Sequence, residues 1–275
     1  MKLRLVPPRH GVLWVRSGFR IFFRRPMAYG ALFTVFMLGV AALLLVPLVG
    51  ALVLLVALPL VTQAFMLATQ RALLERPVLP GVFTEPLRAG RPQARAMLQI
   101  GLAYMVASLA VMWFSGVADG GRFEAFEDAV LGGKADPKQV EALLADPRLL
   151  FGIVLRLGLT SLLALPFWHA PPLVHWGGLP WSKALFFSTM ACWRNKGAFA
   201  AYALTWFAVI VAFGVFVNVV FIAIGQPRLI GFAALTAGLM FSTVFYASLY
   251  FSFADCFEYQ LDVGSPDSLT PRAPS

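Results

Sequence analysis

The sequence has few charged residues and almost no cysteine. Charged side chains make up 13% of its 275 residues, about half of the ~25% found in an average soluble domain. So few charges argue against an ordinary soluble enzyme, whose surface they could not cover. Two cysteines are too few for a disulfide-stabilised secreted scaffold, and 60% hydrophobic residues are too many for a disordered chain. An integral membrane protein remains.

Long apolar runs are abundant instead, and they predict six membrane-spanning helices in an all-α polytopic bundle. A span needs about 20 apolar residues, and the uncharged run between Arg25 and Arg71 is long enough for two. Four later runs are long enough for one span each. The expected parts are a cytoplasmic N-terminus (1–26), spans one to three (27–117), a periplasmic helical hairpin (118–148), spans four to six (149–254) and a cytoplasmic tail (255–275).

Basic residues gather on one side of these spans. Residues 1–26, 71–95 and 183–196 carry fifteen Lys and Arg, whereas 119–148 and Arg228 together carry five. Because basic loops stay in the cytoplasm, we expect both termini on the cytoplasmic side of a bacterial inner membrane. The net charge of +9 then indicates contact with anionic lipid headgroups rather than nucleic acid, since no nucleic-acid motif accompanies it.

Residues 9–25 have the pattern of an amphipathic helix that lies on the membrane. Four arginines fall within one sector of ~80° at helical spacing, and bulky apolar residues occupy the other side. The basic face consists of Arg9, Arg16, Arg20 and Arg24, and the apolar face of Trp14, Val15, Phe19, Ile21 and Phe22. This pattern is typical of interfacial helices. The helix is either a docking site for lipid or a partner, or an anchor that orients the first span.

A second interfacial helix is expected at 182–195, after the proline- and tryptophan-rich stretch at 166–181. Ser188, Cys192 and Asn195 share one face of this helix. Small and weakly polar residues on one face let helix backbones approach closely. The face is therefore either a packing seam within the bundle or a surface for a partner, such as another membrane protein.

Several motifs carry a resemblance to a known family. They are Ala170-Pro171-Pro172-Leu173-Val174, Pro180-Trp181-x-x-Ala184, Ser188, Ala191-Cys192-x-x-Asn195 and the opening Val6-Pro7-Pro8-Arg9-His10-Gly11. With them the chain resembles, over about residues 2–259, an uncharacterised family of six-helix proteobacterial inner-membrane proteins. More distantly, it is similar to the membrane domains found with glycerophosphoryl diester phosphodiesterases. The chain has no phosphodiesterase domain, and the family has no established activity to carry over.

A weak internal repeat is also visible. A basic helix end followed by a hairpin of two spans occurs at Arg24-Arg25 and again at Arg194-Asn195-Lys196. Both units begin on the expected cytoplasmic side, so the repeat would be parallel. Transporters use such repeats, but so do inert scaffolds, and the pattern leaves the two interpretations open.

The sequence contains no recognisable catalytic or metal-binding motif. Metalloprotease, P-loop and nucleophile-elbow signatures are missing, and His169 and His175 are too few ligands for zinc. We therefore expect no enzymatic activity, no metal and no cofactor. Arg156, about eight residues into the fourth span, is a functional candidate because charges inside membranes are costly.

Two interpretations of Arg156 remain open. It lines a polar cavity, with Asn218 as a second candidate lining residue, or it is structural and snorkels or pairs with an acid such as Asp119. In either case we expect it to face other helices, with its guanidinium toward the periplasmic side. A cavity shared by Arg156 and Asn218 would favour a transporter or lipid-handling protein. A solid apolar core with an exposed seam would favour a non-enzymatic protein that binds or positions another membrane component.

Overall fold

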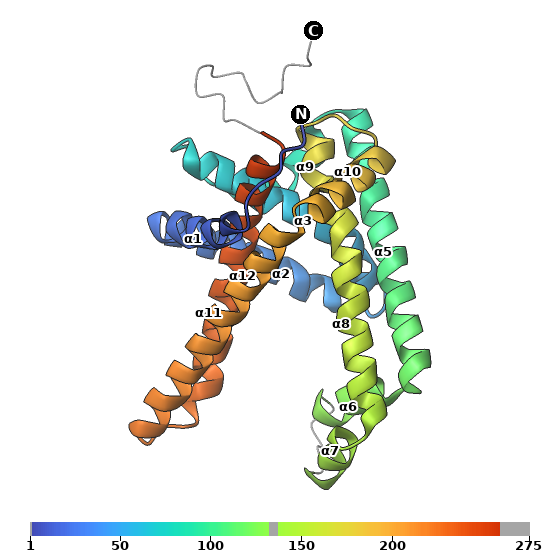
Figure 1. Cartoon of the computed structure of the whole chain (residues 1–275), viewed down its shortest axis with the longest axis vertical. Helices are drawn as coiled ribbons and strands as arrows, with labels where there is room; N and C mark the ends of the chain where they lie inside the picture. Colours follow the sequence, from blue (N-terminus) through green and yellow to red (C-terminus); the bar gives the residue numbers. More distant parts are fainter. Residues whose placement is uncertain (1, 132–136, 259–275) are drawn as a thin grey trace.

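The computed structural model describes residues 2–131 and 137–258, and within them every regular element is a helix (Figure 1). The helices are α1 (Arg9–Arg24), α2 (Pro26–Leu44), α3 (Val49–Leu73), the 3-10 turn η1 (Pro80–Phe83), α4 (Glu85–Arg88), α5 (Arg91–Asp119), α6 (Arg122–Leu131), α7 (Pro137–Leu144), α8 (Pro147–Phe167), α9 (Ala170–His175), α10 (Trp181–Arg194), α11 (Lys196–Ala223) and α12 (Leu229–Cys256). The expected all-α bundle is confirmed.

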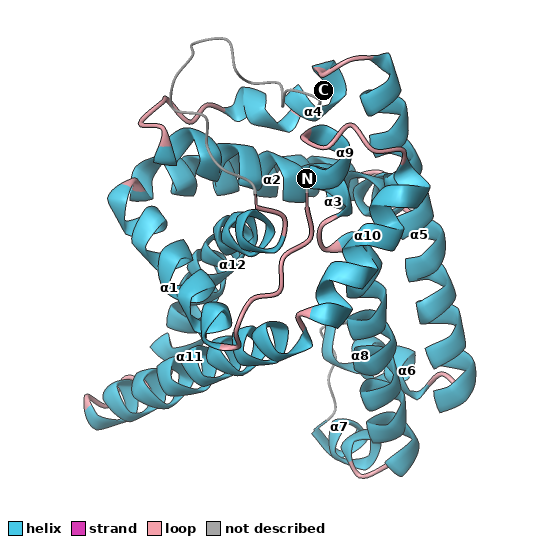
Figure 2. Cartoon of the chain, turned by 45° about the horizontal axis from the view of Figure 1, so that its top comes forward, coloured by secondary structure: helices cyan, strands magenta, loops and turns pink. Residues whose placement is uncertain are grey.

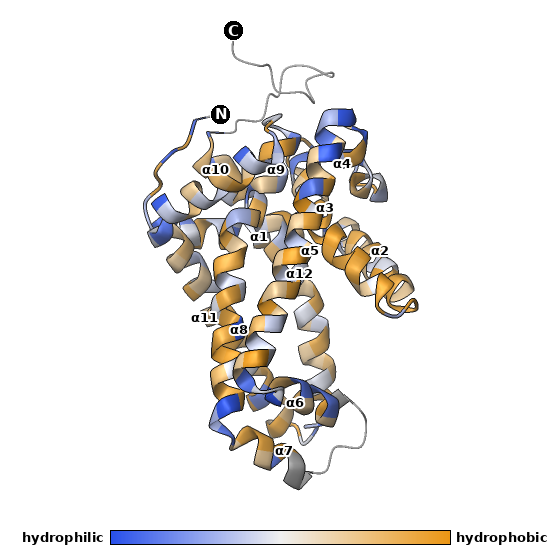
Figure 3. Cartoon of the chain, turned by 90° about the vertical axis from the view of Figure 1, so that its right-hand side faces the viewer, coloured by the Kyte–Doolittle hydropathy of each residue, from blue (hydrophilic) through white to orange (hydrophobic). Residues whose placement is uncertain are grey.

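Six of these segments are long and apolar enough to cross a bilayer: α2, α3, α5, α8 with α9, α11 and α12. The six-span prediction is therefore confirmed. The apolar helices form a broad belt between a hydrophilic region around α4 and another around α6 and α7 (Figure 3). Residues 259–275, which make up most of the expected cytoplasmic tail, lie outside the described residues, as do 132–136 in the expected periplasmic hairpin.

The spans are arranged as three hairpins: α2 with α3, α5 with α8, and α11 with α12. Helix α3 lies at the centre, because it packs against both α5 and α12. From there the α5–α8 and α11–α12 hairpins diverge toward opposite sides of the molecule (Figure 1). The two long hairpins are therefore joined near α3 and α9 and separate along most of their length.

Helix α1 packs its apolar face against protein rather than lipid. It crosses α11 and α12 (Figure 2), and Trp14 and Ile21 are only 1% and 2% exposed. The approach is close because Gly18 has no side chain, and a Cβ there would lie 2.7 Å from Ser248 Cβ. Its four arginines (Arg9, Arg16, Arg20 and Arg24) are all exposed on the opposite face. The amphipathic pattern is therefore present, but the apolar face of α1 is buried against α11 and α12.

Helix α10 does not occupy the position that corresponds to α1. It packs mainly against α8 and α9, whereas α1 packs against α11 and α12. The two basic-ended helices therefore have different partners, and the internal repeat stays a prediction. An aromatic cluster joins the end of α8 to α11: the centroid of the Trp168 ring lies 5.4 Å from that of Phe199 and 5.8 Å from that of Tyr202.

Candidate functional site

A polar cavity lies where α5, α6 and α8 meet, at the end of the bundle far from α1 and α10 (Figure 1). Its volume is about 440 Å³. Helix α5 ends at Asp119, and Gly120 and Gly121 follow with φ angles of 63° and 77°. Glycine adopts this left-handed conformation without steric cost, so the chain reverses sharply and lays α6 over the ends of α5 and α8.

Arg156 reaches this cavity from α8. Its Nε donates a hydrogen bond to Ser115 Oγ at 3.0 Å, and its guanidinium carbon lies 3.8 Å from the centroid of the Phe123 ring. The side chain therefore faces α5 and α6 rather than lipid. Within the described residues it forms no ion pair with an acid. A hydroxyl and an aromatic face hold the guanidinium in place of the acid partner considered from the sequence.

Asp119 is the most unusual group in the cavity wall. It is 1% exposed, and its Oδ1 accepts a hydrogen bond from the Gly121 backbone N–H at 2.8 Å. Its Oδ2 is buried and has no hydrogen-bond partner among the described residues. The carboxylate also lies at the C-terminal end of α5, where the helix dipole disfavours negative charge. An unpaired carboxylate oxygen in such a place is costly unless a cation compensates for it.

Gly152 on α8 makes room for this carboxylate. A Cβ at that position would collide with Asp119 Oδ2 and Cβ. Gly152 lies one helical turn before Arg156 in the sequence, and this spacing predicts free space beside the arginine side chain. In the structure, the Asp119 side chain occupies the space next to Gly152. Sequence reasoning considered Asp119 only as an ion-pair partner of Arg156 and missed it as a residue of the cavity wall. The signal that could have found it is an acid directly before Gly120-Gly121 at the end of an apolar run.

The rest of the cavity combines acids with apolar walls. Glu124 and Glu127 line it from α6 and are exposed, and Trp113 and Met112 line it from α5. Three acids and one base give the lining a net negative charge. No group of three or more His, Cys, Asp or Glu residues in the described part of the chain is arranged to hold a metal ion. The cavity is suited to a ligand that carries at least one positive group.

Asn218 does not share this cavity. It lies exposed on α11, where its Nδ2 donates to the Gly214 carbonyl of its own helix at 2.9 Å. Arg156 belongs to the other long hairpin, and the cavity that it lines does not include Asn218 among its lining residues. The structure thus does not bring Arg156 and Asn218 together, because the α5–α8 and α11–α12 hairpins diverge (Figure 1).

The residues of the expected seam on α10 lie on one face of the helix, and this face is buried inside the protein. Ser188 and Asn195 are 0% and 2% exposed, and Cys192 is 2% exposed. Ser188 Oγ accepts from the His169 N–H at 2.9 Å and donates to the Leu165 carbonyl at 2.8 Å. It thereby joins α10 to the end of α8. Burial raises the pKa of the Cys192 thiol well above its usual range, and nearby Cys256 adds to the effect.

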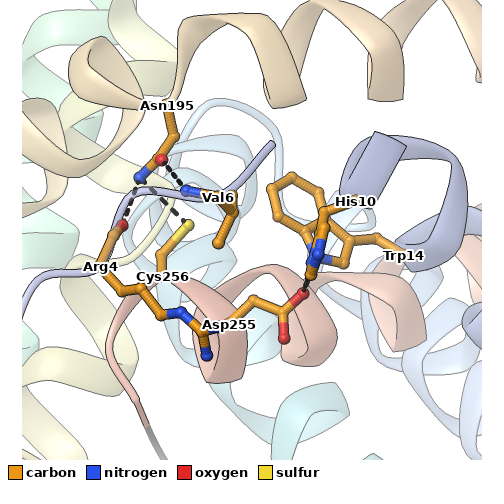
Figure 4. Close-up of polar contacts among 7 residues, drawn as sticks. All are labelled: Arg4, Val6, His10, Trp14, Asn195, Asp255 and Cys256. Carbon is orange, nitrogen blue, oxygen red and sulfur yellow. Dashed lines mark hydrogen bonds and ion pairs between the residues drawn. The ribbon is translucent and has the colours of Figure 1, made fainter. Parts of the chain in front are cut away.

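Asn195 holds the N-terminal segment against the bundle (Figure 4). Its Oδ1 accepts from the Val6 N–H at 2.9 Å, and its Nδ2 donates to the carbonyls of Arg4 at 3.0 Å and Ala191 at 3.1 Å. The Arg4 N–H in turn donates to the Cys256 carbonyl at 2.8 Å. The Asn195 amide therefore ties the segment before α1 to the end of α10, and the Arg4 N–H ties the same segment to the end of α12.

Asp255 makes a second tie between α1 and α12 (Figure 4). Its Oδ2 lies 2.7 Å from His10 Nδ1 and accepts from Trp14 Nε1 at 2.7 Å. The sequence did not single out this trio, since His10 and Asp255 are 245 positions apart. Asn195 is buried, and the seam pattern did not reveal its bonds to residues 4–6.

An apolar groove runs along α12 within the spans. A cavity of about 610 Å³ between α11 and α12 is lined by Gly214, Gly238 and mostly apolar neighbours. A second cavity of about 200 Å³ lies near α3, α5 and α8. Phe245 and Tyr246 line both cavities. The two cavities are therefore adjacent along α12, between the junction of the hairpins and the α11–α12 turn.

Comparison with known proteins places the chain in a family. No family model matches it, and no solved structure matches it. A protein of Burkholderia thailandensis, whose name describes it as a "probable inner membrane protein", is 30% identical over 267 residues, which is 97% of this chain and 97% of the relative. Identity of this degree over nearly the whole of both chains, together with six apolar spans, agrees with the inner-membrane family expected from the motifs. The chain belongs to the family of inner-membrane proteins that this relative represents.

Proposed function

We propose that this integral inner-membrane protein is a non-enzymatic accessory or assembly protein, which binds an apolar transmembrane segment of another membrane protein. The observation that carries the proposal is the groove along α12. Its larger cavity lies between two candidate spans, α11 and α12, a second cavity adjoins it, and the lining of both is largely apolar.

The groove has the composition of an unfilled helix-packing surface. Ala234, Gly238 and Ser242 follow one another at intervals of four residues on α12 and line it together. Small residues at this spacing let a second helix approach closely in a membrane. A Cβ at Gly214 or Gly238 would meet nothing within 4 Å. Space is therefore free on both walls of the groove, and an apolar helix is the occupant that suits it.

The groove is less suited to a polar solute. Its lining contains no Asp, Glu, Lys, Arg or His, and polar solutes need groups that replace their lost hydration. The alternative, a transporter or lipid-handling protein with a cavity near Arg156, keeps that cavity but not a central one shared with Asn218, because the two residues lie on different hairpins. The accessory role is therefore the better supported of the two.

Three further expectations belong to this proposal. The distribution of basic residues supports cytoplasmic termini and a periplasmic α6–α7 segment. The distant resemblance around residues 170–195 to membrane domains found with glycerophosphoryl diester phosphodiesterases supports a membrane role that does not require a catalytic domain in the same chain. The exposed arginines of α1 remain available for anionic headgroups.

The test is to fill the groove without disturbing the fold. Gly238→Leu places a side chain into the free space of the groove, and Gly158→Leu is the matched control. Gly158 is also exposed, a Cβ there would meet nothing within 4 Å, and it lies on α8 outside every described cavity. Both replacements remove a helix glycine and should leave the chain folded.

The measurement is quantitative mass spectrometry of membrane proteins that co-purify with each variant in mild detergent. We expect one or more membrane proteins to be depleted about tenfold by Gly238→Leu and to be retained by Gly158→Leu. Equal recovery with both variants would contradict the proposal. Loss with both would point to a general packing effect and would contradict it as well.

A further inference from the structure

We propose that the cavity between α5, α6 and α8 binds the phosphoethanolamine headgroup of a phospholipid. The inference is independent of the groove on α12, because the two share no lining residue. It rests on three features of the cavity: an unpaired buried acid, a guanidinium without an acid partner, and a position at the end of two spans.

The negative side of the cavity calls for a donor of hydrogen bonds that carries positive charge. Asp119 Oδ2 is buried and unpartnered within the part of the chain that the structure describes. Glu124 and Glu127 add two acids at the exposed side of the same cavity. A primary ammonium has three N–H donors and one positive charge, so it can satisfy Asp119 and still be shared with the rim.

The positive side is Arg156. Its Nε is occupied by Ser115, which leaves the two terminal nitrogens of the guanidinium for another acceptor. A guanidinium fork matches phosphate oxygens in geometry and charge. Arg156 and Asp119 line one cavity yet form no ion pair with each other. The cavity thus holds separated positive and negative groups, as a zwitterion with phosphate at one end and ammonium at the other requires.

The location fits a lipid headgroup. The cavity lies at the ends of the spans α5 and α8, beside the hydrophilic α6–α7 region (Figure 3). Trp113, a wall residue, is 64% exposed, and tryptophan gathers at the level of lipid headgroups. The acyl chains of a bound phospholipid would continue along the exposed apolar surface of α5, which includes Val106 and Leu109.

The ammonium type decides the specificity. Asp119 Oδ2 needs an N–H donor, which ethanolamine offers and the quaternary ammonium of choline does not. Glycerol headgroups offer no positive charge for the three acids. The cavity should therefore rank lipids with the same acyl chains in the order phosphatidylethanolamine, then phosphatidylcholine and phosphatidylglycerol.

The experiment uses the full chain, purified in mild detergent and stripped of lipid. Binding of the three lipids is measured by native mass spectrometry and by the shift in the midpoint of thermal unfolding. We expect phosphatidylethanolamine to bind the unmodified chain about tenfold more tightly than phosphatidylcholine. This comparison needs no variant, and equal binding of these two lipids would overturn the proposal. Phosphatidylglycerol, which the exposed arginines of α1 also attract, is compared in a chain in which Arg16 and Arg20 are replaced with glutamine.

Variants then locate the site. Asp119→Asn keeps an oxygen for the Gly121 N–H but removes the charge, and Arg156→Leu removes the phosphate partner. Both should abolish the preference for phosphatidylethanolamine, whereas Asp128→Asn should keep it, because Asp128 is an exposed acid on α6 outside the cavity lining. A preference that survives Asp119→Asn would overturn the assignment.

A soluble arm separates lipid from free ligand. O-phosphoethanolamine carries the same headgroup without acyl chains. We expect it to protect only at concentrations at least a hundredfold above those of the lipid, since it lacks the apolar contacts. Equal protection by the soluble compound would overturn the lipid source and assign the cavity to a free phosphorylated amine.

Discussion

Asn195 offers the sharpest test of how the segment before α1 is held against the bundle. Replacing it with alanine removes the acceptor of the Val6 N–H and the donor to the Arg4 carbonyl. These two hydrogen bonds are the only ones that join the Asn195 side chain to residues 4–6 in the described structure. A net hydrogen bond contributes about 0.5–1.5 kcal/mol, and a buried group left unpaired costs about 1–3 kcal/mol.

The segment before α1 should therefore open more easily by about 2–3 kcal/mol in Asn195→Ala. Since 1.4 kcal/mol corresponds to a factor of ten, the Val6 amide should exchange its hydrogen about 30- to 140-fold faster. Hydrogen exchange followed by mass spectrometry on the purified protein measures this rate. Trypsin should also cleave after Arg4 and Arg9 sooner than in the unmodified chain.

Asn218→Ala is the matched control. Asn218 is exposed, and its amide bonds only to a carbonyl of its own helix, so exchange near the N-terminus should not change. Unchanged exchange at Val6 in Asn195→Ala would refute the reasoning, because it would mean that the amide does not hold this segment. Equal acceleration in both variants would refute it too.

Three further outcomes follow from the buried and exposed faces of α1 and α10. Gly18→Ala should lower the unfolding midpoint by overpacking α1 against α12, at a cost of about 1–3 kcal/mol; Gly30→Ala, with open space beside it, should not. The Cys192 thiol should resist maleimide at pH 7–8 until the protein is denatured, since burial raises its pKa and limits access; rapid native labelling would contradict its burial. Replacing Arg16 and Arg20 with glutamine should weaken binding of phosphatidylglycerol by about 1 kcal/mol per residue, measured by native mass spectrometry; unchanged binding would exclude them as headgroup contacts.

The spans could be predicted because the bilayer imposes one requirement on each of them. Every backbone group in the hydrocarbon must bond within its own helix, so a continuous apolar run is sufficient to identify a span. The run from Ala96 to Ala118 is an example, since it lies within the observed Arg91–Asp119. The ends were harder to predict, because α5 begins at Arg91, before the uncharged run starts.

Contacts between distant segments could not be predicted in the same way. The amphipathic pattern of α1 indicates an apolar surface but not its partner, and Trp14 fits a lipid interface as well as a protein interior. Asn195 was expected in a seam, but its bonds to residues 4–6 depend on how α10 meets α12. Asp119 became a site residue only because α6 folds back over α5, which depends on two glycines after it.

The most direct test of the proposed accessory role is a photoreactive amino acid at Ser242 in living cells. Ser242 is exposed and lines the groove between α11 and α12, and the same probe at Gly158 on α8 is the control. We expect a discrete protein adduct from position 242 that is missing from position 158 and is lost when Gly238→Leu is added. No adduct at 242, or the same adduct from both positions, would contradict the claim that this groove binds another membrane protein.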